Sequence, residues 1–141
     1  MQIIGFNFTK IAAERRKTPE GKIEIKSNIN LKSITPEKFD LIKDKDTLRM
    51  DFEFFVEYLP DIARISFEGS VIVSLDKNQS KEIQKKWKNK KIEEDLRLPI
   101  FNMILAKCNL KALQIEEEFS LPTHVPLPRL TPPQNNQGYV Q

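Results

Sequence analysis

The residues of this chain that are best suited to catalysis or ligand binding are a single histidine, a single cysteine and a run of lysines. His124 is the only histidine and Cys108 the only cysteine among 141 residues. A zinc site takes three or four ligands, and this chain offers one of each type. A cysteine nucleophile needs a nearby base, and none lies close in sequence. We therefore expect no catalytic residue and no metal site, with His124 in an exposed arm and Cys108 as a buried, inert thiol.

Phosphate-binding glycine loops are also missing, because the whole chain has four glycines. The acidic residues lie on alternating strand positions or in the run Glu116-Glu117-Glu118, where solvation explains them. The expectation is a protein that is not an enzyme and has no cofactor.

The lysine run spans residues 80–91 and holds six lysines, one glutamate and Trp87. A basic helix with an aromatic residue can meet phosphates and stack on bases. The alternative is a solvated helix face with Ile83 and Trp87 turned onto the core. Arginine, the better reader of bases, is absent from the run, so the second interpretation is favoured over a nucleic-acid partner.

A long β-hairpin over residues 48–75 must form the core of the scaffold. Apolar residues recur at every second position in both halves, which is typical of strands with one buried face. If Leu59 faces Ile62 across the turn, Phe54 faces Phe67 and the apolar faces coincide. That register also sets Glu53 opposite Glu68, which is unfavourable. A two-residue slip would keep the faces matched and avoid this pair.

Two further strands precede the hairpin, over residues 3–16 and 22–32. The apolar phase of the first changes near Thr9-Lys10, as it does at a β-bulge. A polar connection, residues 35–47, follows, with Phe39, Leu41 and Ile42 as its apolar anchors.

Helical spacing begins after residue 76. We expect a short helix with Ser80 as its N-cap and a second helix over residues 93–108, with Pro99 in its first turn or at a kink. Residues 110–119 either continue that helix or form a short third one. The fold class is thus α+β, with a four-stranded antiparallel sheet followed by two C-terminal helices.

The domain organisation expected is a single domain, residues 1–121, then a Pro-rich extended arm and flexible tail, residues 122–141. The net charge of +3 is too small to imply a nucleic-acid partner by itself. The lone cysteine and the lack of a membrane-spanning run or signal peptide predict a cytoplasmic protein.

Four apolar residues are candidates for contact with a bound peptide. Phe55 and Ile72 fall on the mostly polar face of the hairpin, and the first strand adds whichever set its bulge turns outward, represented by Ile11. Trp87 completes the set. Exposed apolar groups in a small domain usually mark an interface, although the helices could equally cover them.

The order of elements resembles the SecB-like export chaperones, as a divergent member. The likeness covers residues 3–130 and rests on IEIKSNINLKS, then LRMDFEFFVEY and ISFEGSVIVSL, then a helical pair and LPxxxPLPRL. It implies a four-stranded sheet backed by a long helix, assembly into dimers and tetramers, and binding of unfolded polypeptides without nucleotide. Some relatives protect the antitoxin of a toxin–antitoxin pair. The SecB surface that meets the SecA translocase is acidic, whereas helix 80–91 is basic here, so SecA docking does not follow.

The leading hypothesis is therefore an ATP-independent holdase that binds non-native or extended polypeptides through apolar grooves on the sheet, as a homo-oligomer. The alternatives are a nucleic-acid-binding protein that uses residues 80–91, and an adaptor for one dedicated partner that docks the arm of residues 122–133.

Overall fold

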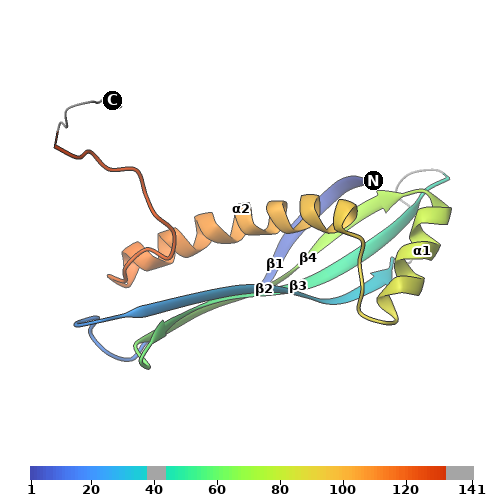
Figure 1. Ribbon diagram of the computed structural model, residues 1–141. Coiled ribbons are helices and arrows are strands. Elements are labelled where there is room, and N and C mark those ends of the chain that lie inside the picture. Colours follow the sequence, from blue (N-terminus) through green and yellow to red (C-terminus); the bar gives the residue numbers. More distant parts are fainter. Residues whose placement is uncertain (38–43, 133–141) are drawn as a thin grey trace.

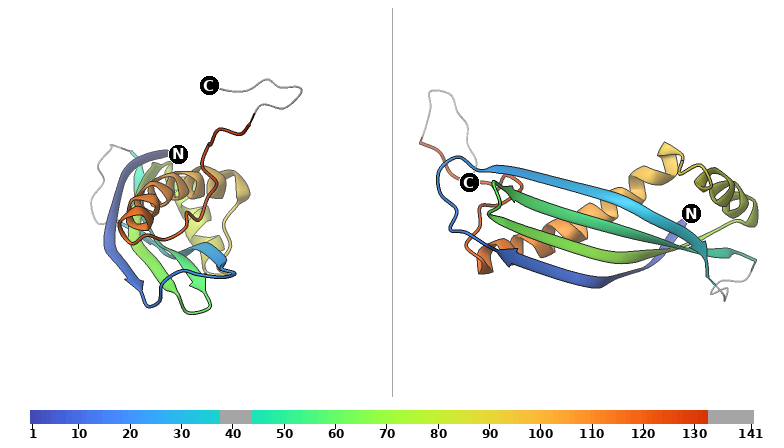
Figure 2. Two further views of the ribbon diagram at one scale, coloured as in Figure 1. Left: turned by 90° about the vertical axis from the view of Figure 1, so that its left-hand side faces the viewer. Right: turned by 90° about the horizontal axis from the view of Figure 1, so that it is seen from below.

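The computed structural model describes residues 1–37 and 44–132. Its elements are β1 (Gln2–Arg15), β2 (Glu24–Pro36), β3 (Asp46–Leu59), β4 (Ala63–Leu75), α1 (Lys77–Trp87) and α2 (Glu94–Glu118). The strands lie in the order β1-β4-β3-β2, all antiparallel, so β1 and β2 form the two edges. Figures 1 and 2 show a long twisted sheet with α2 along one face and α1 at one end. The α+β architecture expected from the sequence is confirmed. The anchors Phe39, Leu41 and Ile42, and the tail from residue 133, lie outside the described residues.

The β3–β4 hairpin adopts the first of the two registers considered. Tyr58 pairs with Ala63, Phe54 with Phe67 and Met50 with Val71. Directly opposed residues share a face of the sheet, so one face of the hairpin is continuously apolar. The side chains on it that are essentially inaccessible form the centre of the core: Leu48, Met50, Phe52, Phe54, Val56, Tyr58, Ala63, Ile65, Phe67, Val71, Val73 and Leu75.

The predicted bulge in β1 is present, between Phe8 and Lys10, and its effect is to keep the apolar residues together. Before it, Phe6 pairs with Val71; after it, Ile11 pairs with Phe67. Both partners face α2, so the extra residue restores the phase and turns neither set to the opposite side. The expectation that the bulge would place one set outward is wrong for this reason. A bulge in β2, between Leu31 and Ser33, has the same result for Ile34.

At one end of the sheet α1 packs against β2 and β3, and along the apolar face lies the long helix α2. Its buried residues recur at helical spacing: Ile100, Ile104, Cys108, Ala112 and Ile115. The segment 110–119 continues the helix, which settles the choice left open by the sequence. Pro99 lies within the helix, beyond its first turn.

The N-cap of α1 is Asp76, not Ser80 as predicted. The backbone N–H of Asp76 donates to the Gln79 side chain at 3.4 Å. Ser80 lies one turn further in, buried, and its Oγ accepts a hydrogen bond from Gln84 Nε2 at 3.0 Å. Aspartate and serine are both favoured caps, and in the folded chain the turn begins at the earlier residue.

Candidate peptide-binding surface

Two apolar strips flank α2 on the helix-covered face of the sheet. We define the β1 strip as Phe6, Phe8 and Ile11, and the β2 strip as Ile25, Ile29 and Leu31. In β1 the bulge places all three on this face, and in β2 they alternate with exposed polar residues. Their pairing with core residues of β3 and β4 fixes the orientation, because opposed residues share a face. The strips are therefore the apolar margins of the core.

These margins are incompletely covered because one helix is narrower than four strands. Adjacent strands lie about 4.8 Å apart, whereas a helix with its side chains spans about 10 Å. Helix α2 packs against β4, near the middle of the sheet. As a result, the β2 strip and the two phenylalanines of the β1 strip are half-buried, and Ile11 is 47% exposed. The aliphatic stem of Lys107 brings its Nζ to 6.0 Å from the Phe6 ring centroid, at the rim of the covered region.

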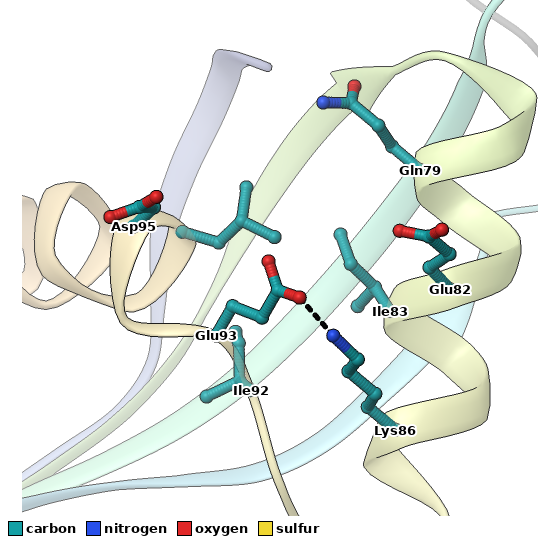
Figure 3. Close-up of a pocket in the computed structure, with 8 residues that line it drawn as sticks. Gln79, Glu82, Ile83, Lys86, Ile92, Glu93 and Asp95 are labelled. Carbon is teal, nitrogen blue, oxygen red and sulfur yellow. Dashed lines mark hydrogen bonds and ion pairs between the residues drawn. The ribbon is translucent and has the colours of Figure 1, made fainter.

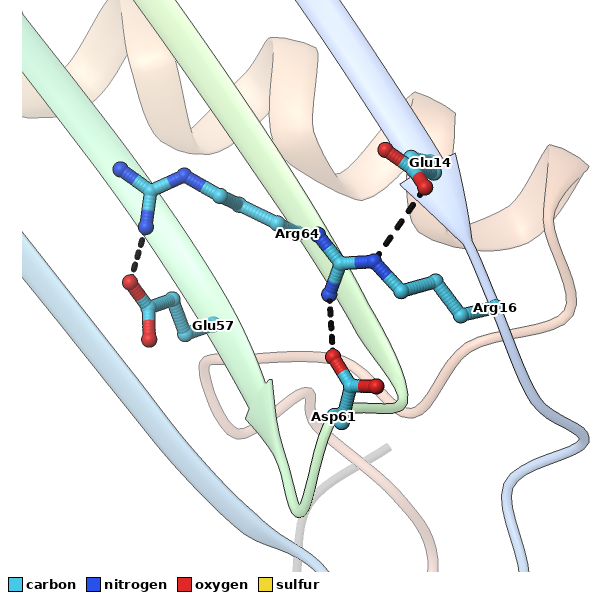
Figure 4. A network of polar contacts seen from close by, with 5 residues as sticks. All are labelled: Glu14, Arg16, Glu57, Asp61 and Arg64. Carbon is cyan, nitrogen blue, oxygen red and sulfur yellow. Dashed lines mark hydrogen bonds and ion pairs between the residues drawn. The ribbon is translucent and has the colours of Figure 1, made fainter.

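The opposite face of the sheet is polar and carries a series of ion pairs. Arg16 bonds Asp61 at 2.9 Å and Glu14 at 3.2 Å, and Arg64 pairs with Glu57 in the same region (Figure 4). Further along, the hydroxyls of Ser33 and Ser70 donate to the two oxygens of Asp51, at 2.8 and 2.7 Å. The charged residues named on this face have polar partners, which does not favour binding of apolar chains.

A buried polar cluster ties the start of the C-terminal arm to α2 and β3. Oε2 of Glu116 accepts from the Tyr58 hydroxyl and lies 2.8 Å from Nδ1 of His124. Nε2 of His124 lies 2.8 Å from Oδ1 of Asn109, and the carbonyl of Pro122 lies 2.9 Å from the Tyr58 hydroxyl. Burial, and then the hydrogen bond to Glu116, raise the pKa of Tyr58, so its hydroxyl stays protonated and donates.

Two predictions about this cluster are wrong. The side chain of His124 is 2% exposed, so it does not lie in an exposed arm, and Glu116 is fully buried rather than solvated. Both errors have one cause. The two residues are polar, and only the fold reveals that each is a hydrogen-bond partner of the other. The one signal in the sequence was the position of Glu116, which directly follows Ile115 and so lies beside the apolar stripe of α2.

Cys108 is buried on α2, as expected, and burial raises the pKa of its thiol to about 12. Such a thiol remains protonated at neutral pH and is a poor nucleophile. Within residues 1–37 and 44–132, no three His, Cys, Asp or Glu side chains gather in a way that could hold a metal ion. In the same part of the chain, no helix combines the length and apolarity needed to cross a membrane.

A pocket of about 200 Å³ lies between α1 and the start of α2. Its lining includes the apolar side chains of Ile83, Ile92 and Leu96. Figure 3 shows Ile83 and Ile92 beside the Lys86–Glu93 ion pair. Trp87 lies near the end of α1, half-buried against the core, with Nζ of Lys90 4.9 Å from its ring centroid. The interpretation of residues 80–91 as a solvated face, with Ile83 and Trp87 turned inward, is thus confirmed.

The structure does not bring the four predicted contact residues together. Phe55 and Ile72 lie on the polar face, where the Arg64 guanidinium sits 4.5 Å from the Phe55 ring centroid. They are six positions apart in register, since Phe55 pairs with Ser66, which corresponds to about 20 Å along the strand. Ile11 lies on the other face and Trp87 on α1. Only Ile11 belongs to a strip. Alternation could have identified the other members of the two strips, which are Phe6, Phe8, Ile25, Ile29 and Leu31.

Comparison with known proteins supports the fold through structure rather than sequence. No family model matches the chain, and no curated protein matches its sequence. Among solved structures, the chain is similar to a SecB-like chaperone of Mycobacterium tuberculosis in complex with a ChAD peptide from the HigA1 antitoxin. The TM-score is 0.52 at 12% identity, over 94% of this chain and 92% of the other. The chain therefore has a SecB-like fold.

Proposed function

We propose that this protein is an ATP-independent holdase that binds extended, non-native polypeptides along the β1 and β2 strips. The observation that carries the proposal is the pair of half-covered apolar margins on either side of α2. Soluble monomers rarely leave contiguous apolar surface open without a partner for it. The SecB-like neighbour was solved with a peptide bound, which supports a polypeptide as the class of ligand.

The chemistry of the strips suits a client without a fixed sequence. Burial of apolar area contributes about 25 cal/mol per Å², and ordering of the client offsets much of this. The strips offer aliphatic and aromatic side chains and no array of directional polar groups. Binding should therefore depend on the apolar content of the client and hardly on its order.

The free edges of β1 and β2 add a second mode of contact. An edge strand presents unpaired backbone groups that an extended chain can meet. Lys26 and Lys32 on β2 are exposed, and charged residues of this kind discourage edge-to-edge aggregation. A client could pair transiently with an edge strand and also contact the adjacent strip. Such pairing is compatible with both the unpaired backbone groups and the exposed lysines.

The proposal includes self-association, a cytoplasmic location and the absence of enzymatic activity. Leu98 and Leu110 are exposed on α2, and Phe101, Leu105 and Leu113 are half-buried beside them. A second copy of the chain could cover this side of the helix. Static light scattering would give the mass of the assembly, and a monomer at micromolar concentration would contradict this part of the proposal.

The structure favours the nucleic-acid alternative less. Trp87 packs against the core and carries Lys90 over its ring, which leaves little of the ring free for a base. Lys86 is also paired with Glu93. A steep decline of binding with salt on a nucleic-acid column would restore this alternative.

The test is suppression of aggregation. Urea-denatured citrate synthase is diluted into buffer with and without the protein, and light scattering is followed in the absence of nucleotide. We expect suppression near equimolar amounts, and the same with a second, unrelated client. Unchanged scattering with both clients would refute the holdase. Suppression confined to one would favour the dedicated adaptor.

A further inference from the structure

Leu121 and the first residues of the C-terminal arm, up to His124, lie against α2 and β3. This segment has no regular secondary structure. Leu121 is buried and its N–H donates to the Glu116 carbonyl at 2.8 Å. The His124 ring meets Phe54 edge-on, with centroids 6.2 Å apart. The segment thus inserts one apolar and one polar side chain between α2 and β3.

We call the residues that surround this segment, namely Phe54, Tyr58, Asn109 and Glu116, the seat. Beyond the seat the arm leaves the body of the protein. Leu127 is 53% exposed and Leu130 is 84% exposed. In Figure 1 the chain turns back beside the C-terminal end of α2 and then projects away from it. The side chains of Leu127 and Leu130 are therefore mostly open to solvent, in contrast to those of Leu121 and His124.

The seat is continuous with the β2 strip. Phe54 pairs with Ile29, and Tyr58 pairs with Ile25, so both aromatic rings extend the same apolar surface toward α2. The seat also has spare polar capacity, because Oε1 of Glu116 is buried and has no hydrogen-bond partner among the described residues. A buried carboxylate oxygen without a partner is a disfavoured state that another donor can relieve.

We propose that Leu121–His124 occupies a client subsite, formed by Phe54, Tyr58, Asn109 and Glu116, and that clients displace it. This inference rests on the proposed function and identifies part of the site. The ligand it fits is an extended segment with an aliphatic side chain followed, three residues later, by a hydrogen-bond donor that reaches Glu116. Displacement exposes two aromatic rings next to the β2 strip and enlarges the client surface.

His124 is the only histidine of the chain, so its ring resonances in an NMR spectrum report directly on the seat. The probe is reduced, carboxymethylated α-lactalbumin, which is permanently unfolded, with its own histidines unlabelled and this protein isotopically labelled. Saturating client should move the His124 signals to the positions of a solvent-exposed histidine. Client binding measured by calorimetry with the His124 signals unmoved would overturn the subsite and leave the holdase intact. Absence of client binding would instead count against the holdase.

A second test supplies the segment in trans. A chain truncated after Ser120 should bind a synthetic peptide of residues 119–132, and a matched peptide with Leu121→Asp and His124→Ala should bind at least about tenfold more weakly, or about 1.4 kcal/mol. The full-length chain should bind neither. Equal binding of the two peptides by the truncated chain would overturn the proposal.

Truncation can destabilise the fold, so the full-length variant His124→Ala provides an independent measurement. It should bind carboxymethylated α-lactalbumin about tenfold more tightly, since a competitor that fills the site lowers apparent affinity by its occupancy. Leu127→Ala and Leu130→Ala, in the unseated part of the same arm, are the controls and should keep the wild-type affinity. Equal affinity for His124→Ala and wild type would contradict displacement.

Discussion

Glu53 lies directly opposite Glu68 in the β3–β4 hairpin, and two lysines approach Glu68 from the edge strands. Nζ of Lys32, on β2, is 3.1 Å from Oε1 of Glu68, and Nζ of Lys10, on β1, is 3.8 Å from Oε2. The glutamate pair that argued against this register is therefore partly neutralised by strands that the hairpin alone does not include. Alignment of the apolar faces excludes a one-residue slip, and the contacts of Glu68 with Lys10 and Lys32 offset the like-charge pair in the observed register.

Removal of the charge on Glu53 should stabilise the fold. Glu53→Gln relieves the repulsion and keeps both lysine contacts of Glu68, so we expect a gain of about 0.2–1 kcal/mol in the free energy of unfolding. Urea denaturation at low and high salt measures it, and the gain should shrink as salt screens the pair. The matched control is Glu57→Gln, which loses the Arg64 ion pair and should not gain stability. A loss for Glu53→Gln would show that the repulsion is unimportant.

Gly69 should tolerate no side chain. A Cβ built on it would lie 2.6 Å from Cζ of Phe52 and even closer to the carbonyl oxygen of Asn7. Both neighbours belong to well-packed strands, so Gly69→Ala should cost about 1–3 kcal/mol or more. Gly5→Ala is the control, since its Cβ would meet Ile72 at 3.4 Å, an ordinary contact. Thermal unfolding should separate the two variants, and similar midpoints would contradict the packing described here.

The sequence revealed what alternation and helical spacing encode, namely the matched apolar faces of the hairpin, the bulge in β1 and the apolar stripe of α2. It did not reveal features that depend on contacts between distant segments. Glu116 and His124 read as solvent-exposed polar residues, yet Tyr58 and Asn109 complete a buried cluster around them. The choice of contact residues also depended on sequence pattern alone, and the structure does not bring the four together. Phe55 and Ile72 were chosen as apolar exceptions on a polar face, whereas the open apolar area lies at the edges of the face that α2 covers incompletely.

Tyr58 should make stability depend on pH in the alkaline range. Burial raises its pKa in the folded state, whereas the unfolded residue titrates near pH 10. The folded state therefore holds the proton more tightly, and stability is lost as pH rises above about 10. Tyr58→Phe should cost about 1–3 kcal/mol at neutral pH, because the hydroxyl's buried partners lose a donor.

The same variant should show a shallower decline of stability above about pH 10, followed to about pH 11. Urea midpoints across this range provide the measurement. Lysine deprotonation contributes to the decline in both proteins, so the difference between the two curves isolates Tyr58. Parallel curves would mean that its hydroxyl titrates normally in the folded state.

Ile11→Asp should weaken client binding without unfolding the protein. Full burial of an isoleucine side chain contributes about 1.5–3 kcal/mol, and Ile11 is 47% exposed in the free chain. Burial of the exposed part of the Ile11 side chain by a client is thus worth about 1 kcal/mol, or about a fivefold change in affinity. A charge at this position adds a desolvation penalty in the same direction.

Calorimetry with carboxymethylated α-lactalbumin measures the effect, and circular dichroism verifies the fold. Ile72→Thr, on the polar face, is the matched control and should bind as the wild type does. If Ile72→Thr lost affinity and Ile11→Asp kept it, clients would have to bind the face that the ion pairs occupy, and the assignment of the strips would be wrong.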